Sequence, residues 1–75
     1  MNLHYQLESI IIIMKKINYI ETTKSWYYIY DESGKKIKTV STSIGELKGY
    51  SVNFYIIEHS SWIYTYDPTG KKLYT

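Results

Sequence analysis

The sequence predicts an all-β fold of two tandem, four-stranded antiparallel repeats, each a blade-like meander of 36 residues. Three observations support this prediction. The segment SWYYIYDESGKK at residues 25–36 returns as SWIYTYDPTGKK at residues 61–72, and nine of the fifteen positions in 25–39 recur in 61–75. Ten tyrosines, two tryptophans and one phenylalanine give an aromatic enrichment that is typical of strands. No helical period runs long enough to predict a helix.

Each repeat is expected to contain four short strands. In the first repeat they cover residues 9–15, 17–22, 25–31 and 35–42. In the second repeat they cover residues 45–51, 53–59, 61–67 and 71–75. The third strand is the clearest, because Trp26, Tyr28 and Tyr30 alternate with other side chains at the two-residue period of a strand. A polar break at residues 41–45 separates the repeats.

The chain of 75 residues is expected to form a single small β domain. The first repeat spans residues 4–39 and the second spans residues 40–75. Met14, followed by two lysines, would also make an ordinary start, and residues 1–13 would then be a non-native extension.

A domain this small is expected to need additional stabilisation. A chain of about 60 residues buries only roughly 60% of the surface that it exposes when unfolded. The sequence has no cysteine, so disulfides are excluded and self-association is the expected remedy. Two blades cannot close a ring alone, and their open edges would pair with other chains. A homo-oligomer that completes a ring is favoured over a small sandwich, because the second repeat copies the face of the first.

A repeated turn follows the third strand of each repeat. Aspartate at the first position accepts hydrogen bonds from the backbone, proline presets φ near −65°, and glycine adopts positive φ without a Cβ clash. These residue types predict a hairpin built on a type I turn with a glycine bulge. The residues assigned to the two turns are Asp31, Gly34, Asp67, Pro68 and Gly70.

The aromatic residues divide into a repeated face and a set off that face. The repeated face is predicted to form the core between stacked blades and comprises Trp26, Tyr28, Tyr30, Trp62, Tyr64 and Tyr66. Each ring would bury roughly 150–250 Å² if enclosed. The alternative is that some of these rings stay exposed and stack on sugars or bases. Tyrosines off the repeated face are expected to be exposed and to bind a ligand, and they are Tyr27, Tyr50 and Tyr74.

Lysines follow both turns at the same offset. The four that recur are Lys35, Lys36, Lys71 and Lys72. Lysines on a strand edge block unwanted pairing, which explains them without a ligand. Alternatively they form a basic stripe beside the aromatics, a combination that binds single-stranded nucleic acid or a charged small ligand. The net charge of only +2 makes nucleic acid a possible but not a favoured partner.

The unit W-x-Y-x-Y-D-x-[S/T]-G-K-K, at residues 26–36 and 62–72, resembles the tryptophan-led hairpin of WG-type repeats and of β-propeller blades. Tyr27 and Ile63 stand where WG-type repeats have their glycine. This resemblance implies a repetitive binding surface rather than a reaction. By length and copy number the chain is also similar to two-blade bacterial lectins, which trimerise and bind sugars between blades.

No arrangement of residues predicts an enzyme. Asp31 and Asp67 could form the paired carboxylates of a glycosidase, but the first position of a turn favours backbone hydrogen bonding instead. His4 and His59 stand alone, so neither a metal site nor a cofactor is expected. The sequence also lacks a nucleophile elbow and a glycine-rich phosphate loop.

The leading functional hypothesis is a non-enzymatic, self-associating binding module whose ligand is a carbohydrate or a small polar molecule. The alternatives are a single-stranded nucleic-acid-binding β protein and a small structural or partner-inhibiting protein of bacterial or phage type. A cytoplasmic location without membrane contact is expected, because the apolar run at residues 10–14 is too short for a membrane span or a signal core.

Overall fold

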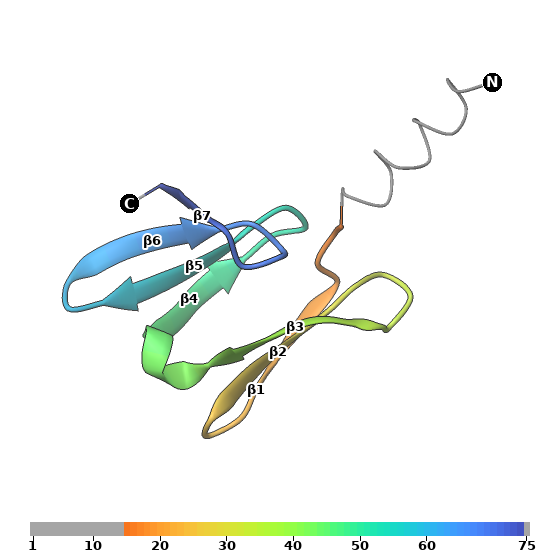
Figure 1. The fold of residues 1–75 in the computed structure, drawn as a ribbon, viewed down its shortest axis with the longest axis horizontal. Coiled ribbons are helices and arrows are strands. Elements are labelled where there is room, and N and C mark those ends of the chain that lie inside the picture. Colours follow the sequence, from red (N-terminus) through yellow and green to blue (C-terminus); the bar gives the residue numbers. More distant parts are fainter. Residues whose placement is uncertain (1–14, 75) are drawn as a thin grey trace.

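The computed structural model describes residues 15–74 of the chain. Its strands form two antiparallel sheets, a first sheet in the order β1-β2-β3 and a second in the order β4-β5-β6-β7 (Figure 1). The strand bounds are β1 (Tyr19–Thr22), β2 (Trp26–Tyr30), β3 (Lys36–Ser41), β4 (Glu46–Tyr50), β5 (Tyr55–His59), β6 (Trp62–Tyr66) and β7 (Lys72–Tyr74). No α-helix occurs between residues 15 and 74, and the predicted all-β class is confirmed.

The strands lie inside seven of the eight ranges expected from the sequence, apart from shortened ends. The expected strand at 9–15 lies outside the described residues except for Lys15, which is not in a strand. The expected break contains the 3₁₀ turn η1 (Thr42–Ile44), which leads from one sheet to the other. The hydroxyl of Ser41 accepts a hydrogen bond from the backbone N–H of Ser43 and caps this turn.

Gly45 lets the chain pass close to β5 as it enters the second sheet. Its φ of 137° lies in a region that favours glycine. A Cβ atom at this position would lie 2.7 Å from the Cγ2 atom of Ile57 and would also meet the backbone carbonyl of Glu58. The position therefore requires glycine both for its backbone conformation and for space.

Strand registers recur 36 residues apart. Tyr19 pairs with Tyr30 across β1 and β2, and Tyr55 pairs with Tyr66 across β5 and β6. The pairing of β2 with β3 has a register shift between residues 29 and 30, and the pairing of β6 with β7 has one between residues 65 and 66. The spacing seen in the sequence is thus also the spacing of equivalent backbone pairs.

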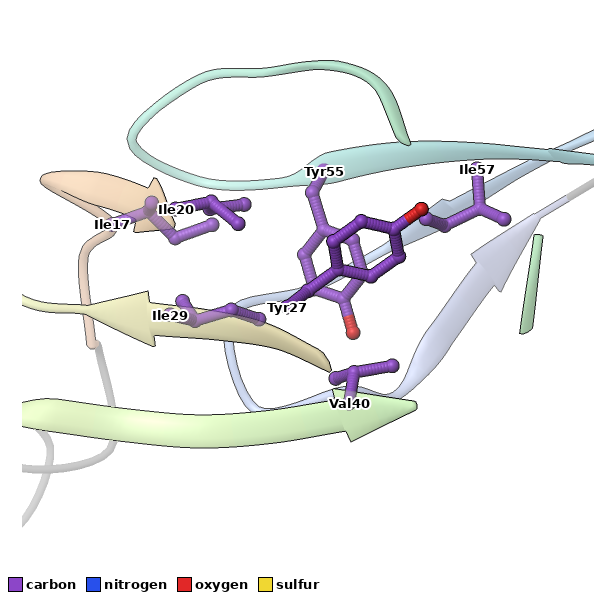
Figure 2. Packing of buried hydrophobic residues seen from close by; sticks show 7 residues of the cluster. All are labelled: Ile17, Ile20, Tyr27, Ile29, Val40, Tyr55 and Ile57. Carbon is purple, nitrogen blue, oxygen red and sulfur yellow. The ribbon is translucent and has the colours of Figure 1, made fainter. Parts of the chain in front are cut away.

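The core lies between the two sheets and draws side chains from both (Figure 2). Its buried members are Ile17, Ile20, Tyr27, Ile29, Val40, Tyr55 and Ile57. Ile29 and Ile57 are completely buried. Ile17 precedes β1 and also joins the sheets through its backbone N–H, which donates to the carbonyl of Val52 at 2.8 Å.

The predicted core face is wrong for the first sheet. The strand β2 turns Tyr27 and Ile29 to the core, so Trp26, Tyr28 and Tyr30 point to the opposite side. The cause lies in the neighbouring strands. Positions opposite the buried pair are apolar in part (Ile20, Val40), whereas those opposite the outward face include Glu21, Thr39 and Ser41.

The second sheet uses the other face of its equivalent strand. Tyr66 packs against the core and stacks on Tyr55 with ring centroids 5.3 Å apart. Tyr64 is half-buried opposite Ile57, which lies in the core. Trp62 lies at the end of this face and is 61% exposed, whereas the sequence predicts that it lies in the core.

Tyr27 is also not the exposed ligand residue that the sequence predicts. Only 6% of its surface is exposed. Its hydroxyl donates to the carbonyl of Gly45 at 2.7 Å and accepts from the N–H of Leu47 at 3.1 Å. Tyr27 therefore links β2 to the entry of the second sheet.

Candidate binding site at two Trp–Tyr–Lys sets

Two equivalent groups of side chains combine an exposed indole, a half-buried phenol and a lysine ammonium. The first set is Trp26, Tyr28 and Lys36, and the second set is Trp62, Tyr64 and Lys72. In each set the indole and the phenol are two residues apart on one strand and so project from the same face. Of the two indoles, Trp26 is 44% exposed and Trp62 is 61% exposed.

The ammonium groups lie over the phenol rings at nearly the same distance in both sets. The Nζ atom of Lys36 is 4.4 Å from the ring centroid of Tyr28. The Nζ atom of Lys72 is 4.7 Å from the ring centroid of Tyr64. A cation above a phenol ring at this range is attracted by the electron-rich face, by about 0.5–1 kcal/mol at an exposed site. The attraction favours a fixed place for each ammonium over the phenol that stands two residues from the indole.

The hairpin turns position these lysines. In the first turn the backbone N–H of Gly34 donates to the carbonyl of Asp31 at 3.0 Å, and Gly34 has a φ of 85°. The second turn repeats this geometry, with a 2.9 Å bond from Gly70 to Asp67 and a φ of 95° at Gly70. Pro68 occupies the second position of that turn and is buried.

Each turn aspartate is engaged as a hydrogen-bond acceptor. The Oδ1 atom of Asp31 accepts from the N–H and hydroxyl of Ser33 and from the N–H of Lys35. Asp67 accepts the same three bonds from Thr69 and Lys71. These contacts tie down the turn and occupy one carboxylate oxygen of each residue.

The pKa values of both carboxyl groups lie below their ordinary value. For Asp31 the largest cause is the hydrogen bond from the Ser33 side chain, followed by that from the backbone of Lys35. For Asp67 partial burial acts to raise the pKa, but hydrogen bonds from Lys71 and Thr69 outweigh it and lower the pKa. Both groups are therefore ionised at neutral pH and serve the turn as acceptors.

The remaining predicted ligand residues do not gather with the two sets. Tyr50 ends β4 and is 39% exposed. Tyr74 ends β7 and pairs with Thr65, while its side chain lies outside the described part of the structure. Lys35 and Lys71 are exposed and contribute their backbone N–H groups to the turns.

Two neighbours of the first set were missed by the sequence analysis. Tyr19 is 54% exposed and pairs with Tyr30, and the carboxylate of Glu21 accepts a 3.3 Å hydrogen bond from the Tyr30 hydroxyl. Desolvation is the largest cause that raises the pKa of Tyr30, followed by the negative charge of Glu21 and by this hydrogen bond. The missing signal was the register of β1 against β2, which determines the residues beside the set.

The site has no feature of a metal centre among the described residues. Between residues 15 and 74, no three His, Asp or Glu side chains come together in a way that could hold a metal ion. No helix in this part of the chain is long and apolar enough to cross a membrane. No family model matches the chain, and neither the curated proteins nor the solved structures include one found to be similar.

Proposed function

We propose that this protein is a non-enzymatic binding module that self-associates and takes a carbohydrate or another small polar molecule as its ligand. The observation that carries the proposal is the recurrence of the Trp–Tyr–Lys set on both sheets. Large apolar side chains normally gain about 1.5–3 kcal/mol from burial, yet both indoles remain substantially exposed. Tryptophan is enriched at interfaces, because its ring combines a large apolar surface with a polar N–H group.

The proposal includes a repeated architecture. We treat each sheet as one copy of a 36-residue unit, because strand registers, turn hydrogen bonds and lysine–tyrosine contacts recur at that spacing. A repeated unit presents the same binding surface more than once. Two weak sites on one chain would then act together on a polymeric ligand such as a polysaccharide.

The chemistry of each set fits a sugar. An indole offers a flat apolar surface for the C–H face of a pyranose ring. The ammonium over the neighbouring phenol supplies three hydrogen-bond donors for hydroxyl or carboxylate oxygens. Because the ammonium covers the phenol ring, the indole is the stacking surface and the lysine is the polar anchor. Neither role requires a group that breaks bonds.

Tryptophan fluorescence tests the proposal directly, because the chain has only the two indoles of the two sets. Titration with a panel of glycans should give saturable quenching of the unaltered chain. The variants W26F and W62F each leave one indole and should report the two sets separately. Absence of quenching across the panel would exclude a carbohydrate that stacks on these indoles.

The lysines provide a matched pair for the same titration. Lys72→Met removes the ammonium from the second set. In the W26F chain it should raise the Kd measured by quenching of Trp62 about fivefold, or by about 1 kcal/mol. Lys71→Met is the control, because Lys71 is an exposed neighbour outside the set. Equal effects of the two substitutions would mean that charge alone, rather than the lysine over the ring, is responsible.

Single-stranded nucleic acid is the second candidate ligand, since each set offers an ammonium for a phosphate and an exposed indole for a base. Stacking contributes about 1–3 kcal/mol per base in such proteins. Binding of an oligonucleotide should weaken steeply as salt is raised, because phosphate contacts release counterions. Binding of a neutral glycan should change little with salt, so the two ligands are distinguished in one experiment.

A further inference from the structure

The two sheets pack face to back. The strand β2 turns the face with Tyr27 and Ile29 to the core, whereas β6 turns the opposite face, with Tyr64 and Tyr66, to the same core. The strands are equivalent at an offset of 36 residues. The interface inside the chain therefore joins two different faces of one kind of sheet.

As a result, the outer face of each sheet is of the kind that the other sheet buries. The outer face of the first sheet, here called the head face, carries Tyr19 and the first Trp–Tyr–Lys set. The outer face of the second sheet, here called the tail face, carries Ile56, Glu58, Ile63 and Thr65, of which Thr65 is 8% exposed. The head face is equivalent to the face that the second sheet buries, and the tail face to the one that the first sheet buries.

Comparison of equivalent residues shows that the two outer faces lack a covering layer. Tyr19 is 54% exposed, while its equivalent Tyr55 is 2% exposed in the core. On the tail face Ile63 is 46% exposed, while its equivalent Tyr27 is 6% exposed. Leu73 is also 46% exposed, whereas Ile37 at the equivalent position packs against the core. Three apolar positions that are covered in one sheet are thus exposed on the outer face of the other.

We propose that the head face of one copy of this chain packs against the tail face of another, in the arrangement by which the two sheets pack within each chain (Figure 1). The partner is a second copy because the chain already contains this interface once, built from equivalent positions. The contact is heterologous, so repetition closes a ring or extends a fibre, according to the rotation between copies. A closed ring of any number of chains would contain twice that number of sheets.

The interface between copies is more polar than the one within a chain. Glu21 stands at the position of the fully buried Ile57, and Thr65 stands at the position of the fully buried Ile29. Ile63 also lacks the hydroxyl with which Tyr27 links the sheets. Association should therefore be reversible and dependent on protein concentration.

This inference deepens the proposed self-association and is compatible with ligand binding at the sets. Trp62 lies on the face that packs inside the chain and still remains 61% exposed, at the rim of that interface. Trp26 occupies the equivalent position on the head face. Association would then leave both indoles at the rims of sheet boundaries, where a ligand can reach them.

Two face-specific substitutions test the mode of association. Tyr19→Glu should block the head face, and Ile63→Glu should block the tail face. Val52→Glu is the control, because Val52 is as exposed as Ile63 but lies in the turn between β4 and β5, away from both faces. Circular dichroism and thermal unfolding would verify that each variant is folded.

Sedimentation analysis should show that each face variant alone is monomeric and that the control associates like the unaltered chain. An equimolar mixture of the two face variants should form a dimer, since each retains the face that the other lacks. Self-association of either face variant at the strength of the unaltered chain, or a monomeric mixture, would overturn the head-to-tail mode. Glycan quenching of Trp62, measured with Tyr19→Glu combined with W26F, separates failure of association from failure of ligand binding.

Discussion

The Tyr27 hydroxyl is the side-chain group that joins the two sheets by hydrogen bonds. It contacts the carbonyl of Gly45 and the N–H of Leu47, both at the entry to the second sheet. A ring hydroxyl in this place provides a hydrogen-bond partner for two part-buried backbone groups. The tyrosine that the sequence suggests as a ligand residue is therefore a structural link.

Replacing Tyr27 with phenylalanine should destabilise the protein by about 2 kcal/mol, because two part-buried backbone groups lose their partner. Urea unfolding monitored by circular dichroism would measure the loss. Tyr50→Phe is the control, since Tyr50 is exposed at the end of β4. A cost below about 0.5 kcal/mol for Tyr27→Phe would mean that water replaces the hydroxyl without penalty.

Tyr55 should make stability sensitive to alkaline pH. Burial raises the pKa of Tyr55 from 10.0 to about 12, and the nearby Tyr66 and Asp67 add to the shift. Because the folded-state pKa is the higher one, the contribution is complete below pH 10 and is lost as the pH rises towards 12. A shift of this size corresponds to about 2–3 kcal/mol of stability.

The measurement compares urea midpoints at pH 9 and pH 11.5 in the unaltered chain and in the Tyr55→Phe variant. The unaltered chain should lose more stability than the variant across this interval. Tyr50→Phe should behave as the unaltered chain does, because its ring lies outside the core. Identical losses in all three proteins would contradict the assignment to Tyr55.

At the scale of elements, the hairpin of β1 and β2 and the hairpin of β5 and β6 lie 36 residues apart but differ in their turns. The turn between β5 and β6 places Ser60 at a φ of 53° and Ser61 at a φ of 71°. Positive φ at both central residues is the geometry of a type I′ turn, which favours Asn-Gly. Among the described residues other than glycine, only these two serines have positive φ.

The double substitution Ser60→Asn and Ser61→Gly should therefore stabilise the protein by about 1 kcal/mol, or roughly 4–8 °C in Tm. Thermal unfolding would measure the gain. Lys24→Asn with Ser25→Gly is the matched control in the equivalent turn, where positive φ is absent and no gain is expected. Equal gains at both turns would show that the effect does not arise from relief of backbone strain.

Strands and turns could be predicted from the sequence because their signals are local. Alternation in 26–30 and the Asp and Gly of each turn act within a few residues. The buried face of β2 could not be predicted in this way, since both faces have the same period of two. The choice depends on Ile20 and Val40 in the neighbouring strands, and those contacts follow from register.

The candidate site shows the same division between local and non-local signals. The offset predicts the repeated lysines, either as edge protection or as ligand residues, and two of them lie over tyrosine rings. Which lysine of each pair does so depends on the irregular register beside Tyr30 and Tyr66. A bulge of this kind changes the direction of a side chain in a way that sequence spacing does not reveal.

At the scale of the whole molecule, face-to-back packing accounts for the exposed apolar positions on both outer faces. The chain buries one example of each face and leaves Tyr19, Ile63 and Leu73 exposed on the others. A protein of this size has little core to spare, so association through these faces would add stability as well as area. Under the proposed head-to-tail mode, the molecule would be a two-sheet segment of a larger stack.

The molar mass of the unaltered chain in solution tests this account most directly. Sedimentation equilibrium over a range of concentrations should give masses that rise above the 8.9 kDa of one chain towards a fixed multiple of it if the stack closes. The increase should disappear when Ile63 is replaced by glutamate. A folded chain that remains at 8.9 kDa at every concentration would contradict the account.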